Sequence, residues 1–115
     1  MALVVTNSLP IPGLELWNYD NLDTADSAPQ SIEAGSTSTV VGSIQGVSSS
    51  WGGGSLALQG SNDGTNWVNL TDPFGATIAI TANGAAEFNT AMRYIRPLVT
   101  GGSGDDIDVF ITLRF

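Results

Sequence analysis

From residue 36 onward, apolar residues recur at every second position in short runs that Gly, Asn, Asp and Ser separate. A period of two is that of a β-strand with one buried face, and it differs from the period of an amphipathic helix. The pattern predicts strands over residues 39–47, 55–60, 66–70, 76–81, 85–89, 93–100 and 106–115. Short strands that follow one another at this spacing are typical of an all-β, antiparallel sandwich.

The last predicted strand, residues 106–115, has the most regular alternation in the chain. Its apolar residues at every second position are Ile107, Val109, Ile111, Leu113 and Phe115. The residues between them are polar except for Phe110, so we expect one buried face and one outward face. Pro97 lacks an N–H group, and the strand over residues 93–100 is therefore expected at a sheet edge or a bulge.

Glycine-containing turns divide these strands. Asp63-Gly64 and Asn83-Gly84 are dipeptides that accept positive φ in tight hairpin turns. Residues 48–55 (SSSWGGGS) are expected to form a longer, flexible loop that carries Trp51.

Residues 1–35 differ from the rest of the chain. They contain Pro10, Pro12 and Pro29, several acidic residues and no basic residue. Turn-forming residues flank the one strand-like run, residues 14–20 (LELWNYD), and its charges are all of one sign. We therefore expect an extended N-terminal arm over residues 1–35 and a β-sandwich domain over residues 36–115 that folds without it.

The composition of the chain excludes most kinds of catalytic site. The 115-residue chain has no Cys, no His and no Lys, and its formal net charge is −8. It therefore offers no imidazole base, no thiolate and none of the usual zinc ligands. A glycosidase needs a cleft with two carboxyl groups across a sugar, which a chain this small with three Glu is not expected to form. We expect no enzymatic activity and no cofactor.

Charge and hydropathy also limit the partners. The sequence pI is near 4.1, whereas binding to DNA or RNA phosphates needs a basic surface. Arg93 and Arg96 are three positions apart on a predicted strand, so they are expected on opposite faces and not in one basic patch. The apolar runs are far shorter than the roughly 18 to 20 residues of a membrane span, and the N-terminus lacks the features of a signal peptide. We expect neither a nucleic-acid nor a membrane partner.

Two groups of oxygen-bearing side chains are candidate Ca²⁺ ligands. They are Asn18, Asp20, Asn21, Asp23 and Asp26 in one group and Asp105, Asp106 and Asp108 in the other. Neither group has the spacing of an EF-hand. Solvated acidic loops and turn caps are the favoured interpretation, and Ca²⁺ binding is left open.

Four aromatic residues are candidates for an interface because each lies in the arm, in a Gly-rich loop or on the polar face of a strand. They are Trp17, Tyr19, Trp51 and Phe110. Aromatic residues at such positions are either interface anchors or minor parts of the core, and both roles are left open.

The run LALQGSNDGTNWVNL at residues 56–70, together with RYIR at residues 93–96, resembles two families. One is the discoidin domain, also called the coagulation-factor type C domain, whose jelly roll has a similar strand, turn and Trp and a similar later strand. The other comprises small virion proteins of tailed phages, including capsid decoration or cement proteins, which are also acidic and poor in Lys. The resemblance covers residues 55–115. It implies a jelly-roll-like sandwich.

For function, the discoidin resemblance implies sugar or lipid binding at apical loops. This chain is shorter and lacks the cysteine pair that commonly closes that fold, so no binding residue is carried over. The phage resemblance implies a structural virion protein. Together with the absence of catalytic side chains and the arm without a core of its own, it leads us to expect a protein on the capsid exterior that contacts the major capsid protein as a homotrimer, with the arm on neighbouring subunits. The alternative is a carbohydrate-binding module or tail-fibre domain in which Trp51, Trp67 or Tyr94 stacks on a sugar ring.

Overall fold

The structure is a computed structural model that describes residues 2–34 and 39–114. The described residues form nine strands and no helix, which confirms the predicted all-β class, although the pattern predicts only seven strands. The strands are β1 (Val4–Ile11), β2 (Leu14–Leu22), β3 (Ile32–Glu33), β4 (Val40–Ser50), β5 (Ser55–Ser61), β6 (Val68–Asn69), β7 (Gly84–Thr90), β8 (Tyr94–Thr100) and β9 (Asp106–Arg114). This part of the chain therefore contains no helix long and apolar enough to cross a membrane.

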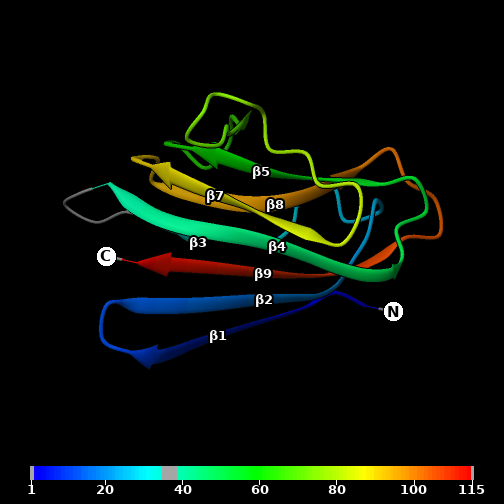
Figure 1. Ribbon diagram of the computed structural model, residues 1–115, viewed down its shortest axis with the longest axis horizontal. Helices are drawn as coiled ribbons and strands as arrows, with labels where there is room; N and C mark the ends of the chain where they lie inside the picture. The colour runs from blue at the N-terminus through cyan, green and yellow to red at the C-terminus, as the bar shows by residue number, and fades with distance from the viewer. Residues whose placement is uncertain (1, 35–38, 115) are drawn as a thin grey trace.

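The strands form two antiparallel sheets (Figure 1). The five-stranded sheet has the order β1-β2-β9-β4-β7, and the four-stranded sheet has the order β3-β8-β5-β6. Strand β9 lies at the centre of the larger sheet, paired with β2 on one side and β4 on the other. The free edges of this sheet are β1 and β7.

The core lies between the two sheets and is built by residues at alternate positions. In β9, Ile107, Val109, Ile111 and Leu113 are at most 1% exposed, which confirms the predicted face; Phe115 lies outside the described residues. Other fully buried residues come from both sheets, among them Ile44, Leu56, Leu58, Phe88 and Ile95. Each such side chain contributes about 1.5 to 3 kcal/mol of burial free energy, so the shared core is the main source of stability.

The N-terminal segment is integrated into the sandwich, and the expected extended arm over residues 1–35 is not confirmed. Strand β2 pairs with β9, β1 pairs with β2, and β3 pairs with β8. Tyr19, Leu22 and Ile32 have no exposed surface. The physical reason is that β2 covers one side of the central strand β9, and its inward side chains complete the core. Residues 36–115 alone would lack this cover.

Two predicted strands differ from the observed ones. The strand predicted over residues 66–70 is reduced to the two residues of β6, and residues 76–81 make only isolated bridges, Thr71 to Thr77 and Leu56 to Ile80. Ile78 and Ile80 are nevertheless buried, so the apolar alternation reflects burial without regular pairing.

Pro97 lies in β8, which is flanked by β3 and β5. Strand β3 pairs only with Tyr94 and Ile95, so at Pro97 the ladder continues only on the β5 side, opposite Leu58. Locally this position is an edge, which suits a residue without an N–H group.

Candidate interaction surfaces

The sequence leaves open for Tyr19 both an interface role and a place in the core, and the structure shows it in the core. Its side chain is fully buried, and its hydroxyl donates a hydrogen bond of 2.6 Å to the carbonyl oxygen of Gln30. The residue faces inward because it sits opposite Val109, which is also buried. Tyr19 is therefore part of the core and has no exposed surface in this chain.

Trp17 and Trp51 are half-buried and pack against the core. The Trp17 indole N–H donates to the Glu15 carboxylate, and the Trp51 Nε1 donates to Asn83 Oδ1 at 2.8 Å. Asn83 also accepts a bond of 2.8 Å from the Ser48 amide, so its side chain braces the Gly-rich loop. The loop that carries Trp51 is therefore anchored, and both indoles have structural contacts.

Phe110 is half-buried on the outer face of the five-stranded sheet. In the register it lies opposite Asn18 of β2 and Gln45 of β4. Asn18 Oδ1 is buried there without a hydrogen-bond partner among the described residues. The outer face thus combines an aromatic ring with amide groups, and an interface role for Phe110 stays a prediction.

Strand β1 is a free edge without charge. Its eight residues, VVTNSLPI, contain no acidic or basic side chain. Val4, Leu9 and Ile11 are 50%, 68% and 56% exposed. Natural sheets commonly protect an edge with charges, bulges or very short strands. Among the other described edges, β7 carries Glu87, and β3 and β6 have two residues each. Strand β1 has a register shift between Ser8 and Ile11, where Pro10 lacks an N–H group, so the uncharged edge that is open to regular pairing is its first part, residues 4–8.

A chain of polar contacts begins at Trp67 on the four-stranded sheet. The Arg96 guanidinium lies 4.2 Å from the centre of the Trp67 ring, and Arg96 Nε donates to Gln59 Oε1 at 3.0 Å. Gln59 Nε2 donates in turn to Asn69 Oδ1 at 3.2 Å. These contacts hold a half-exposed indole beside two amide side chains, an arrangement that suits a hydroxyl-rich ligand.

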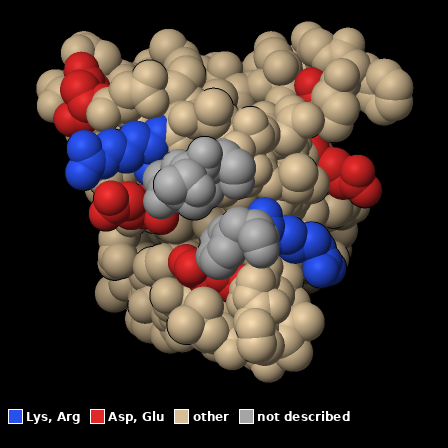
Figure 2. Space-filling model, turned by 90° about the vertical axis from the view of Figure 1, so that its left-hand side faces the viewer, with Lys and Arg blue, Asp and Glu red and all other residues tan. Residues whose placement is uncertain are grey.

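Arginine does not gather into one patch on the face seen in Figure 2. That picture shows two separate arginine groups, each with acidic atoms nearby. The ion pair between Arg93 and Glu33, with an N to O distance of 3.6 Å, is of this kind. The Arg93 guanidinium also lies 5.0 Å from the centre of the Tyr94 ring.

The turn after β5 is fixed by one carboxylate. Asp63 Oδ1 accepts bonds of 2.8 to 2.9 Å from the amides of Thr65 and Asn66 and from the Ser61 hydroxyl. These donors hold the pKa of Asp63 well below its ordinary value. Gly64 has a φ of 75°, as the predicted turn requires, whereas Gly84 is not among the positive-φ residues and begins β7.

A hollow of about 210 Å³ opens beside this turn. Its walls combine apolar and polar groups, and they are formed by Gly60, Ser61, Asn62, Asp63, Asn66, Val68 and Met92. More apolar than polar surface faces the hollow, and the acidic wall residue Asp63 is already engaged by its own hydrogen bonds. The hollow can therefore accept an apolar group.

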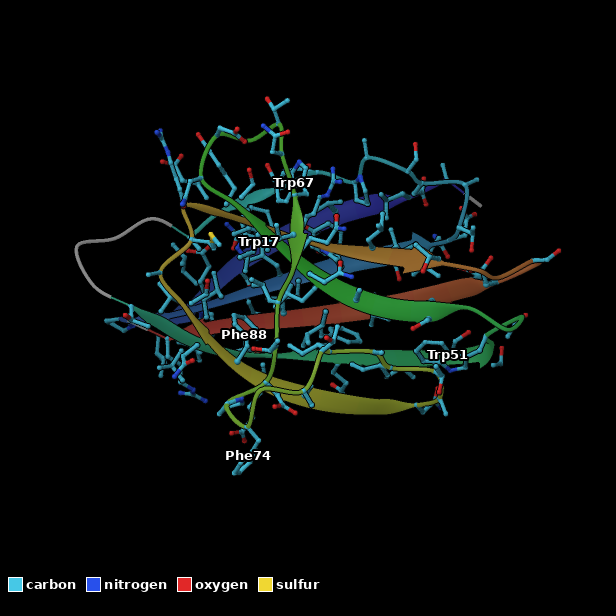
Figure 3. All side chains as sticks on the ribbon, turned by 90° about the horizontal axis from the view of Figure 1, so that it is seen from above. Trp17, Trp51, Trp67, Phe74 and Phe88 are labelled. Carbon is cyan, nitrogen blue, oxygen red and sulfur yellow. The ribbon has the colours of Figure 1, made fainter. Side chains whose placement is uncertain are left out.

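Phe74 is 97% exposed and projects from the loop between Leu70 and Ile78 (Figure 3). Sequence reasoning missed this residue. The signal that was present is Asp72-Pro73-Phe74-Gly75, in which Asp, Pro and Gly occupy their preferred positions in a type I turn. The pattern predicts the turn, but the exposure of the ring depends on how far the loop stands out from the sheets.

The acidic groups do not converge on a metal site within the described ranges, where no group of three or more carboxylates is placed to hold an ion. Asp23 and Asp26 cap their own turn, and Asp105 accepts a bond of 2.6 Å from the Thr24 hydroxyl. Asp20 and Asp108 form a pair that raises the pKa of Asp20, through a hydrogen bond first and through repulsion second.

Comparison of the chain with protein-family models, with curated proteins and with solved structures gave no match. The geometry of the surfaces therefore carries the functional argument.

Proposed function

We propose that this chain is a structural virion protein that decorates the exterior of a phage capsid, binds the major capsid protein and assembles as a homotrimer. The observation that carries the proposal is the uncharged, exposed edge strand β1 in a chain whose net charge is −8. The proposal assigns the chain no catalytic role and no cofactor.

Strand β1 would contact the shell by strand addition. A free edge presents main-chain N–H and C=O groups that an extended segment of another protein can pair with, and exposed side chains such as Leu9 and Ile11 add apolar contact. The hairpin of β1 and β2 thus takes the role that the sequence suggested for an extended arm. The acidic remainder of the surface would have no attraction for packaged DNA.

The order of the strands supports a jelly-roll relationship. Strands β2 to β9 fall into two sheets of four, β2-β9-β4-β7 and β3-β8-β5-β6, once the additional edge strand β1 is set aside. This order is compatible with two Greek keys, and it supports the proposal of a jelly roll, an architecture found in viral capsid proteins and in lectins. The relationship is an analogy of fold, and it favours a capsid role and carbohydrate binding equally.

Binding to empty shells tests the proposal. The shells are assembled from a phage major capsid protein, and co-sedimentation measures the affinity. Leu9→Lys with Ile11→Lys places two charges on the β1 edge and is expected to weaken binding at least tenfold. Ala82→Lys with Ala79→Lys, two exposed positions away from β1, is the control with the same change in charge. Wild-type protein that fails to bind, or an edge variant that binds as tightly, would overturn the proposal.

The second candidate function is carbohydrate binding, and the chain of polar contacts at Trp67 favours it. A sugar ring would stack on the exposed part of the Trp67 indole while Gln59 and Asn69 bind its hydroxyl groups. Trp51, the other indole that the sequence suggested for this role, packs against the core and is less available. A glycan array in which Trp67→Ala abolishes binding and Phe74→Ala does not would favour this function. If the wild type binds no glycan on the array, carbohydrate binding is rejected and the capsid role remains the favoured function.

A further inference from the structure

Arg96, Gln59 and Asn69 form a row across three neighbouring strands on the outer face of the four-stranded sheet. Gln59 of β5 lies opposite Arg96 of β8 on one side and opposite Asn69 of β6 on the other. Ile95 and Leu58, which precede Arg96 and Gln59 in their strands, have no exposed surface. Because side chains alternate along a strand, the row points away from the core.

The row holds the Arg96 guanidinium in place without using most of its donors. The guanidinium carbon lies over the Trp67 ring, 4.2 Å from its centre, and Arg96 Nε donates to Gln59 Oε1 at 3.0 Å. The N–H groups of the two terminal nitrogens have no protein acceptor within the described ranges. These N–H groups lie in the plane of the guanidinium, in a fork that matches the two oxygens of a carboxylate.

The four-stranded sheet is poor in acidic residues, although the net charge of the chain is −8. Strands β5, β6 and β8 contain none, and β3 contains Glu33, which forms an ion pair with Arg93. The strands of the larger sheet carry Glu15, Asp20, Glu87, Asp106 and Asp108. The row is therefore the part of the two sheets where an anion would meet the least repulsion.

Arg96 lacks an ion pair among the described residues, and the acidic groups closest along the sheet are already engaged. Glu33 is bound by Arg93, and Asp63, in the turn that approaches Tyr94, accepts four hydrogen bonds from its own turn. Partial burial lowers the pKa of Arg96 below its ordinary value, so an opposite charge beside it would be favourable. Exposed charges beyond about 8 Å are largely screened at physiological ionic strength.

The neutral groups beside the guanidinium fit a sugar ring. Asn69 Nδ2 has no acceptor in the described part of the chain and can donate to a hydroxyl group. Trp67 is half-buried, and the part of its indole that Arg96 leaves uncovered offers a flat apolar surface to the C–H groups of a ring. The next pair along the two strands, Ala57 and Leu98, is apolar and half-buried and extends this surface.

We propose that this row binds a sugar residue that carries a carboxylate, such as a uronic acid. The carboxylate lies on the terminal nitrogens of Arg96, the ring lies against Trp67, and a hydroxyl group accepts from Asn69. The inference rests on the carbohydrate-binding function proposed above, and it names the class of sugar. Arg96 provides the preference for the acid, whereas Trp67 and Asn69 provide contacts that a neutral sugar shares.

The first test is isothermal titration calorimetry with oligomers of galacturonic acid and with the same oligomers after methyl esterification. The ester removes the charge and keeps the hydroxyl groups. The wild type is expected to bind the acid about tenfold more tightly or better, and added NaCl should reduce this preference. Equal affinities overturn the inference and leave carbohydrate binding standing. Absence of binding to both oligomers also overturns it, while the glycan array judges carbohydrate binding separately.

The second test assigns the preference to Arg96. Arg96→Gln removes the charge and should lower the affinity for the acid to that for the ester. Arg96→Lys keeps the charge without the planar fork and should lose most of the preference. Arg93→Gln, with the same change in charge at a guanidinium that is already paired with Glu33, is the control and should keep the preference.

Circular dichroism checks that all three variants are folded, as expected for changes at positions on the surface of the sheet. A preference for the acid that survives Arg96→Gln overturns the role of Arg96. A polyglutamate peptide that binds as tightly as the uronic acid oligomer overturns the assignment of the row to a sugar.

Discussion

The hydroxyl of Tyr19 in β2 donates a hydrogen bond of 2.6 Å to the main-chain carbonyl of Gln30, two residues before β3. Strand β2 belongs to the larger sheet and β3 to the smaller one. Burial raises the pKa of Tyr19 above its ordinary value, so the phenol stays protonated and remains a donor. The bond therefore joins the connection between the two sheets to the core.

Removal of this hydroxyl should destabilise the protein. Tyr19→Phe keeps the ring but leaves the Gln30 carbonyl without its partner, and we expect the free energy of unfolding to fall by about 1 to 2 kcal/mol. Tyr94→Phe, at a half-exposed position, is the control and should change it by less than about 0.5 kcal/mol. Urea denaturation measures both, and equal midpoints for Tyr19→Phe and wild type would contradict the role of the bond.

Deletion of residues 1–35 should prevent cooperative folding. It removes β1, β2 and β3 and with them Tyr19, Leu22 and Ile32, and it uncovers one side of β9. Deletion of residues 1–12 removes only the edge strand and should leave a folded protein with a lower Tm. Far-UV circular dichroism during heating distinguishes the two. A sharp melting transition from residues 36–115 alone would mean that the N-terminal strands are not needed for the core.

The alternation of β9 made that strand predictable because its period of two is unbroken from Ile107 to Leu113. Strand β2 has a different pattern. Its register shifts between Tyr19 and Leu22, where Asn21 has a φ of 65°, and both flanking residues are fully buried although they are three positions apart. A bulge changes which positions face inward, and the sequence does not reveal where one occurs.

The exposure of Trp51 and of Phe74 depends on contacts that the local sequence does not show. The Gly-rich loop around Trp51 favours exposure, but Gly46 in β4 has no side chain, and a Cβ there would lie 2.7 Å from Trp51 Cη2. The indole therefore packs where two distant segments approach closely. Phe74 lacks any such partner. Contacts between residues far apart in the chain decided both cases, and alternation carries no information about them.

Gly42 should be intolerant of a side chain. It lies in β4 between β7 and β9, and an added Cβ would overlap the Thr112 carbonyl oxygen and lie 2.8 Å from Phe88 Cζ. Gly42→Ala is expected to lower the free energy of unfolding by about 1 to 3 kcal/mol because the packed strands must shift.

Gly84→Ala is the matched control for Gly42→Ala, since the nearest atom to a Cβ there is 3.6 Å away. It should leave the free energy of unfolding unchanged or raise it by up to about 1 kcal/mol, because alanine restricts the conformations of the unfolded chain more than glycine does. Urea denaturation of the two variants gives the comparison, and equal losses would refute the steric explanation.

The pair of Asp20 and Asp108 should make stability depend on pH. A hydrogen bond with Asp108 and repulsion from its charge raise the pKa of Asp20 above its ordinary 3.8. Between 3.8 and the raised value, the folded chain holds a proton that the unfolded chain has released. This pair therefore lowers stability as pH rises through that interval. Asp63 changes stability with pH in the opposite direction. Because its pKa is lowered in the folded chain, it contributes stability that is lost as pH falls.

Comparison of Asp20→Asn with wild type at each pH isolates the pair, since Asp63 is the same in both. The asparagine amide can donate to Asp108 as protonated Asp20 does, but it carries no charge. We expect the Tm of Asp20→Asn to exceed that of wild type at pH 7, and the two to converge near pH 3, below both pKa values of Asp20. Glu87→Gln, an exposed change of the same charge on β7, should show no such convergence. A Tm difference for Asp20→Asn that is constant from pH 3 to pH 7 would mean that the two carboxylates do not share a proton.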